Sequence, residues 1–203
     1  MSVSAERRPR RGRGRRPVED VRSDVLRSVG SILLADGLAR FTIDRVSEES
    51  GVSKTTIYKW WPSKGALALD GYFHAVATTL AFPDTGDLRT DLETQLRAFI
   101  RNLTTTPAGP LLSELIGAAQ TDADLASAYR ALYSSGRRQL AVDRMERGQA
   151  AGQLRADIDP RVLVDQLWGA IYHRLLIPDE PITEALATAL VGNLFDGVAP
   201  HGK

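Results

Sequence analysis

Residues 42–64 read TIDRVSEESGVSKTTIYKWWPSK, and this stretch decides how the rest of the chain is interpreted. Its second half, residues 54–64, holds three lysines and three aromatic residues, although the whole chain uses lysine only once more, at its last position. Apolar residues at helical spacing predict a short helix over residues 43–50 and another over residues 54–60. Gly51 lies between them and suits the left-handed backbone that ends a helix. The stretch therefore predicts two short helices joined by a glycine turn.

The capping and packing residues of this stretch agree with that arrangement. Thr42 and Ser53 stand where each helix would begin, and both are residue types that cap helix N-termini. Ile57 would pack the second helix down onto the first, and the small side chain of Ser47 would allow a close crossing. Together these features predict a helix-turn-helix.

In a helix-turn-helix, the N-terminal part of the second helix enters the major groove and the first helix crosses the DNA backbone. Lys54 and Thr55 lie where base edges would be reached, whereas Thr42, Tyr58 and Lys64 are placed to hold phosphates. The alternative interpretation is an ordinary helical hairpin with a solvated charged face. The candidate DNA-binding residues of the stretch are Thr42, Ser53, Lys54, Thr55, Thr56, Tyr58, Lys59, Trp60 and Lys64.

Helical periodicity continues on both sides of this motif. A first helix begins after Pro17 and is stopped by Gly37, and a fourth, capped by Ser63, runs from Lys64 to about Leu80. No segment alternates with period two as a strand would, and no internal repeat is found. The chain is therefore predicted to be all-α, with about nine helices. The later helical stretches are predicted at residues 87–103, 110–120, 122–150, 160–176 and 181–195.

The composition limits the classes of protein to which the chain can belong. Its 203 residues are 43% hydrophobic, which is enough for one large or two small folded domains. There is no cysteine, and the three histidines are scattered, so neither a thiolate nucleophile nor a metal site is expected. No apolar run approaches the roughly 18 to 20 residues of a membrane span, and no secretory signal is visible. We therefore expect a cytoplasmic protein that needs no cofactor, metal or membrane.

The charge is distributed unevenly along the chain. Residues 1–17 hold seven arginines and one glutamate, a net charge of +6, whereas the remaining 19 basic and 24 acidic residues give −5. Residues 1–17 are too highly charged and too poor in apolar residues to fold by themselves, so they are predicted to form a disordered arm. Arg13, Arg15 and Arg16 are candidates for contact with DNA, either with phosphates or in a narrow minor groove.

The order and spacing of several motifs resemble the tetracycline-repressor (TetR) family. The resemblance rests on Thr42-Ile-Asp-Arg-Val, then Gly51-Val-Ser-Lys-Thr-Thr-Ile-Tyr, then Trp61-Pro-Ser-Lys with Leu67. The chain departs from the common pattern at Trp60, where many members carry a polar or basic residue, and at Ser47, where alanine is usual. The Trp60 indole could donate to a phosphate or pack against the fourth helix.

The resemblance implies a DNA-binding domain over residues 18–62 and a ligand-binding and dimerisation domain over residues 63–203. It also implies a homodimeric transcriptional regulator, a repressor released by a small-molecule effector, on a palindromic double-stranded operator. Its two half-sites would lie about one DNA turn, roughly 34 to 36 Å, or a multiple apart.

The same resemblance suggests where the dimer interface and the effector pocket lie. The last two helices carry broad apolar faces that would pair with their symmetry mates, unless these faces pack into the chain's own core. Aromatic and polar side chains of the middle helices suit a mainly apolar pocket, although core packing explains each of them equally simply. The interface candidates are Val162, Leu163, Leu167, Ile171, Ile182, Leu186 and Leu190, and the pocket candidates are Tyr72, Phe99, Tyr129, Trp168, Tyr172 and His173.

Two other classes of protein were weighed. For an enzyme, the paired carboxylates at residues 122 and 124 and at residues 157 and 159 have a simpler role in helix capping, and no nucleophile elbow or phosphate-binding glycine loop is present. For an architectural DNA-binding protein that uses its basic arm, a body of net −5 lacks the broad positive surface that such binding needs. A sequence-specific regulator without catalytic residues remains the main hypothesis.

Overall fold

The computed structural model describes residues 17–197, except for the side chains of residues 134 and 135, and this part of the chain is entirely helical. The predicted arm, with Arg13, Arg15 and Arg16, lies outside the described residues. The helices form nine continuous rods between residues 17 and 197, because α7, η1 and α8 follow one another without a break. The elements are α1 (Val18–Asp36), α2 (Ile43–Ser50), α3 (Lys54–Trp60), α4 (Lys64–Val76), α5 (Leu88–Thr105), α6 (Ala108–Ala119), α7 (Ala123–Leu132), the π-helix η1 (Tyr133–Arg138), α8 (Gln139–Ala150), α9 (Pro160–Leu176) and α10 (Glu184–Asp196).

Short polar side chains begin several of these helices, as the sequence predicts. Asp122 accepts hydrogen bonds from the backbone N–H groups of residues 124 and 125, and Asp159 accepts one from that of Arg161. Ser63 caps α4 in the same way. Each bond satisfies a backbone donor that the helix itself leaves unpaired. The capping role expected for these two aspartates is confirmed.

Two predicted helices differ in detail from those of the structure. The helix expected to reach Leu80 ends at Val76, because the chain tightens there: Ala77 N–H donates to the carbonyl of His74, and Ala81 N–H to that of Thr78. The helix expected over residues 122–150 is interrupted by the six-residue η1. A π-helix changes the angular spacing of side chains within one rod, and the periodicity of the sequence gave no sign of it.

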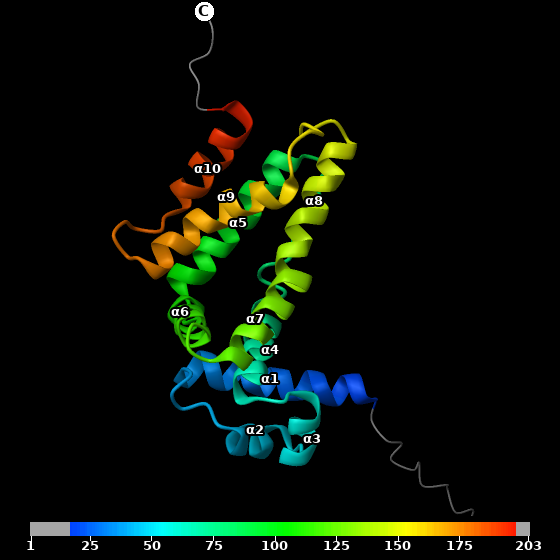
Figure 1. Cartoon of the computed structure of the whole chain (residues 1–203), viewed down its shortest axis with the longest axis vertical. Helices are drawn as coiled ribbons and strands as arrows, with labels where there is room; N and C mark the ends of the chain where they lie inside the picture. The colour runs from blue at the N-terminus through cyan, green and yellow to red at the C-terminus, as the bar shows by residue number, and fades with distance from the viewer. Residues whose placement is uncertain (1–16, 198–203) are drawn as a thin grey trace, which may run out of the picture.

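The three N-terminal helices form a group at one end of the molecule, and α4 joins them to the rest (Figure 1). Helices α1 and α4 cross closely because two glycines meet there. A Cβ atom on Gly71 would lie 2.1 Å from Cγ1 of Val29, and one on Gly30 would lie 2.8 Å from Cβ of Ala75. The crossing therefore leaves no room for a side chain at either glycine.

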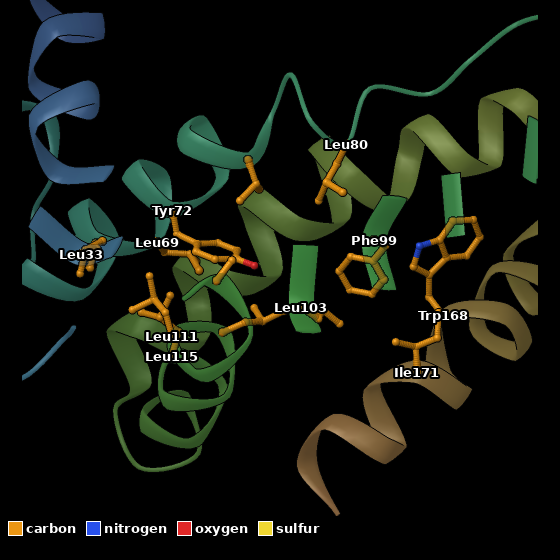
Figure 2. Close-up of a cluster of buried hydrophobic side chains, with 14 of the residues drawn as sticks. Leu33, Leu69, Tyr72, Leu80, Phe99, Leu103, Leu111, Leu115, Trp168 and Ile171 are labelled. Atoms are coloured by element: carbon orange, nitrogen blue, oxygen red, sulfur yellow. The ribbon is translucent and has the colours of Figure 1, made fainter. Parts of the chain in front are cut away.

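The larger body lies on the other side of α4, where α5, α8, α9 and α10 extend away from the N-terminal group (Figure 1). A band of buried apolar side chains runs through it from Leu33 to Trp168 and Ile171 (Figure 2). A buried ion pair also ties α8 to α5, since Nη2 of Arg144 lies 2.6 Å from Oδ2 of Asp91. Burial alone would raise the pKa of Asp91, but hydrogen bonds from Thr85 and Arg144 outweigh it and lower that pKa.

The described part of the chain contains neither a membrane-spanning helix nor a cluster of metal ligands. None of its helices is both long and apolar enough to cross a membrane. Between residues 17 and 197, no three histidine or acidic side chains lie close enough together to hold a metal ion.

Candidate DNA interface and effector cavity

The helix-turn-helix of α2 and α3 is held by hydrogen bonds within residues 42–64. Oγ1 of Thr42 accepts from the backbone N–H of Arg45 at 3.2 Å, and Oγ of Ser53 accepts from that of Thr56 at 3.3 Å. Gly51 ends α2 with a φ of 69°, in the left-handed region that favours glycine. Oγ of Ser47 donates to the carbonyl oxygen of Val52 at 2.7 Å. The serine at this position therefore fixes the turn, which an alanine could not do.

The outward side of α3 presents polar and aromatic side chains to solvent. Lys54, Thr55, Tyr58 and Lys59 are exposed, and Tyr58 is 53% exposed. Thr56 is partly buried, and its hydroxyl lies 3.0 Å from that of Ser53. These positions suit contact with a DNA groove and its phosphates.

Lys54, which is expected to reach base edges, is paired with a carboxylate in the structure. Its Nζ lies 2.7 Å from Oδ1 of Asp44 on α2, and this hydrogen bond raises the pKa of Lys54. Both side chains are exposed, so the pair is weak and readily exchanged for a contact with a base or phosphate. DNA binding through Lys54 would have to break it.

Trp61, the residue after α3, fastens the motif to α4. It is only 4% exposed, and its Nε1 donates to Oδ2 of Asp70 at 2.8 Å. Arg22 of α1 donates to the same oxygen at 3.0 Å and lies over the Trp61 ring. Trp61 therefore anchors the end of α3 to α1 and α4. Trp60 is half-buried with its ring edge-on to that of Trp61, and Lys64 is exposed at the start of α4.

The body contains a narrow inner cavity of about 40 Å³. It is lined by side chains from α4, α5, α6, η1, α8, α9 and the segment after α4. Such a volume holds only a few water molecules. Figure 2 shows four of its lining residues, Tyr72, Leu80, Phe99 and Trp168, along the buried band. Its lining residues are Tyr72, Phe73, Val76, Leu80, Phe82, Gln95, Phe99, Leu112, Tyr133, Arg137, Arg138, Leu140, Ala141, Val164, Trp168 and Tyr172.

A larger and more open outer cavity of about 370 Å³ lies beside the inner one, between α6, α7, η1 and α9. Tyr133 and Tyr172 line both cavities and pack with their rings at 87°. Tyr129 lines the outer cavity and stacks on Tyr133. Burial raises the pKa of Tyr72, Tyr133 and Tyr172, and that of Tyr129 to about 12. These phenols are therefore neutral at physiological pH.

Five of the six predicted pocket residues line one or other cavity; the exception is His173. It is exposed on α9 and lines neither cavity, because it points away from the side on which Tyr172 lies. Sequence reasoning missed Phe73, Tyr133 and Arg137. The spacing of Tyr129 and Tyr133 by four residues was a usable signal, whereas Arg137 enters the cavity from the unpredicted π-helix.

The predicted interface residues fall into two groups. Leu163, Leu167 and Ile171 are at most 5% exposed and belong to the chain's own core, so their assignment to a partner surface was wrong. They lie on the side of α9 that packs against the body. The other candidates remain accessible: Val162 is 50% exposed, and Ile182, Leu186 and Leu190 are half-buried.

Comparison with known proteins agrees with this architecture. Residues 82–194 match the family described as tetracyclin repressor-like, C-terminal domain, and residues 32–70 match the bacterial regulatory proteins of the tetR family. The N-terminal match ends within α4 and the C-terminal match begins after it, so residues 71–81 lie between the two.

Individual relatives are similar over most of their length. The uncharacterized HTH-type transcriptional regulator YdeS of Bacillus subtilis is 37% identical over 186 residues, which are 92% of this chain and 93% of the relative. The DNA-binding transcriptional repressor TetR of Mycobacteroides abscessus is 31% identical over 88% of this chain and 92% of its own. The crystal structure of the TetR family transcription regulator SCO0332 is 66% identical, with a TM-score of 0.85 over 89% of this chain and all of that one. The chain thus belongs to the TetR family of helix-turn-helix transcriptional regulators.

Proposed function

We propose that this regulator is a homodimeric repressor that binds a palindromic operator through α2 and α3 and is released when a small molecule enters the inner cavity. Residues 18–62 would read DNA, and the chain from residue 63 onward would bind the effector and the second protomer. The protein would act in the cytoplasm, where its operator lies.

The observation that carries this proposal is the course of α4. The helix begins at Lys64, directly after the Trp61 anchor, and crosses α1 at Gly71. Its distal part contributes Tyr72 and Val76 to the inner cavity. A ligand that displaces this part would shift a packed helix whose other end holds the recognition helix, and packed interfaces move as units.

A homodimer is supported by the symmetry of DNA recognition, because two protomers double the few base contacts that one α3 offers. The accessible apolar residues of α9 and α10, Val162, Ile182, Leu186 and Leu190, are the surface that we assign to it. Leu186→Asp should therefore convert a dimer into a monomer in light scattering. Ala185→Asp, exposed on the same helix, is the control for a change outside this set of residues. A wild-type monomer at micromolar concentration would contradict this assembly.

The DNA-binding part is tested by selecting binding sequences from a random pool and footprinting the winners. We expect a short protected palindrome whose bases change in Lys54→Ala but not in Lys64→Ala, since the first residue is assigned to bases and the second to phosphates. Tyr58→Phe should weaken binding to all sequences alike. Diffuse coating without a preferred sequence would contradict the proposal.

A further inference from the structure

Arg137 of η1 brings a positive charge to the inner cavity without a carboxylate to balance it. Its Nη2 donates to the carbonyl oxygen of Leu80 at 2.7 Å, and no ion pair joins it to a carboxylate among residues 17–197. The phenols of Tyr72, Tyr133 and Tyr172 line the same cavity but are neutral, so they do not balance its charge. Burial lowers the pKa of Arg137, as desolvation of a cation does.

Other arginines of the same rod are balanced. Arg138 is the next residue, and its Nη2 lies 2.7 Å from Oδ1 of Asp165. Arg144 is paired with Asp91 inside the body. Withdrawing a guanidinium from water is costly unless an anion or several acceptors compensate for it. The guanidinium of Arg137 is therefore expected to bind an anion.

Two further polar atoms at the cavity have no hydrogen-bond partner in the described part of the chain. They are the hydroxyl of Tyr72 and Oε1 of Gln95, on side chains that are 2% and 3% exposed. Figure 2 shows the Tyr72 hydroxyl on the side of the ring that faces Phe99. Buried polar atoms are nearly always hydrogen-bonded, so a donor and an acceptor that line one cavity beside a cation mark a built site.

We propose that the inner cavity binds the acid group of an apolar organic carboxylate, with Arg137 and the Tyr72 hydroxyl donating to its oxygens. Gln95 offers an acceptor to a hydroxyl or N–H group of the same ligand. The inference rests on the proposed function, because it names the class of effector. A single guanidinium balances one negative charge, which favours a monocarboxylate over a phosphate dianion.

The rest of the ligand must be apolar, because Val76, Phe99, Leu112 and Trp168 form the remaining walls. The inner cavity is too small for a drug-sized molecule, which typically needs about 300 Å³ or more. The ligand body would pass between Tyr133 and Tyr172, which line both cavities, into the outer cavity.

The same geometry connects binding to release of DNA. Arg137 holds the carbonyl oxygen of Leu80, which ends the turn after α4, and Nε2 of Gln95 lies 3.4 Å from that oxygen. A bound carboxylate would compete with this carbonyl oxygen for the guanidinium. The carboxylate would be the preferred acceptor, because charge-assisted hydrogen bonds are stronger than bonds to a neutral carbonyl. The end of α4 would then be held less firmly.

The test is calorimetric titration of the full-length protein with acids and their isosteric amides: 4-phenylbutanoate with 4-phenylbutanamide, and decanoate with decanamide. Each acid should bind about ten- to a hundredfold more tightly than its amide, as expected for hydrogen bonds to a charged group. Arg137→Gln should bring the ratio of acid to amide affinity close to one. Arg147→Gln, which removes an exposed arginine of α8 that lines neither cavity, should leave the ratio unchanged.

Tyr72→Phe covers the case in which Arg137→Gln fails to fold. It deletes a hydroxyl that bonds to no described residue, so the protein should fold normally and still lose several-fold of the acid preference. An acid preference that is undiminished in Arg137→Gln or in Tyr72→Phe, or that is lost in Arg147→Gln, would overturn the anion site.

The outcomes separate this inference from the proposed function. If amides bind as well as acids, and Ala141→Leu, which narrows the inner cavity, weakens both, then the cavity is the effector site and only the anion class is wrong. If no acid of the panel binds, the anion site is overturned, while the selected operator and its footprint still decide whether the protein is a DNA-binding regulator.

Discussion

The DNA-reading segment, residues 42–64, takes its caps and its turn from contacts within itself, whereas the inner cavity draws its lining from residues spread between 72 and 172. The first is held by two caps, a glycine turn and one serine hydroxyl, all of them contacts between near neighbours in the chain. The second exists only when several distant helices have packed. Local segments of the first kind can be transferred between proteins, whereas a cavity of the second kind can change its ligand through a few wall residues.

The largest effect is expected from removing a long-range contact in the body that surrounds the cavity. Arg144→Ala leaves Asp91 buried without its cation, which should lower the free energy of unfolding by about 3–5 kcal/mol in urea titrations. Arg155→Ala removes an arginine from an exposed ion pair with Asp157 and should cost much less, because water screens such a pair. Equal costs for the two variants would mean that the buried pair does not hold the body together.

The same ion pair predicts a dependence on acid. Because the pKa of Asp91 is lower in the folded protein than in the unfolded chain, its contribution to stability is present above the unfolded pKa, about 3.9. That contribution is lost as the pH falls through the lower folded value. We expect the free energy of unfolding of the wild type in urea to fall over this pH range, and that of Arg144→Ala to fall less.

The next effect concerns the junction between the two regions. Gly71→Ala places a Cβ atom 2.1 Å from Val29, so α1 and α4 must separate, at an expected cost of about 1–3 kcal/mol in thermal unfolding. Gly117→Ala is the matched control, because a Cβ atom there meets nothing within 4 Å, and alanine favours a helix. If Gly71→Ala is as stable as its control, the crossing is looser than described.

A smaller effect is expected within the DNA-reading segment. Ser53→Ala removes the cap of α3 and should cost about 1 kcal/mol, the usual value for a helix N-cap. The exposed Ser31, inside α1, is the control, since its replacement by alanine should cost nothing. A loss in Ser53→Ala as large as that in Arg144→Ala would contradict the local character of this segment.

The smallest effect concerns the exposed pair on the DNA-reading face. Asp44→Asn frees Lys54 and removes a negative charge, so operator affinity measured by fluorescence anisotropy should rise by about a few-fold. Glu48→Gln changes the net charge equally without a direct bond to Lys54 and should have a smaller effect. Weaker binding by Asp44→Asn would mean that the pair positions Lys54 for its DNA contact.

The same difference explains what could be predicted from the sequence. Caps and turns such as Thr42, Gly51 and Ser53 act over three or four residues, so their pattern reveals the helix-turn-helix directly. The orientation of α9 was less accessible: Leu163, Leu167 and Val162 share one apolar stripe in sequence, yet only packing decides that the first two are buried and the third is exposed.

The cavity was predicted only in part for the same reason. Aromatic residues such as Tyr72 and Trp168 indicate apolar walls wherever they fall. The charge of Arg137 carries no such signal, because the residue lies in a π-helix beside Arg138 and only one of the two enters the cavity without a carboxylate partner among the described residues.

The central claim is that the cavity and the DNA-reading segment communicate through α4. The most direct measurement is a reciprocal titration: operator affinity with and without the acid that binds best, and affinity for that acid with and without operator. We expect each ligand to lower the affinity for the other by the same factor, about 5- to 150-fold, as thermodynamic linkage requires. A factor of one in both directions, with both ligands bound, would contradict the account.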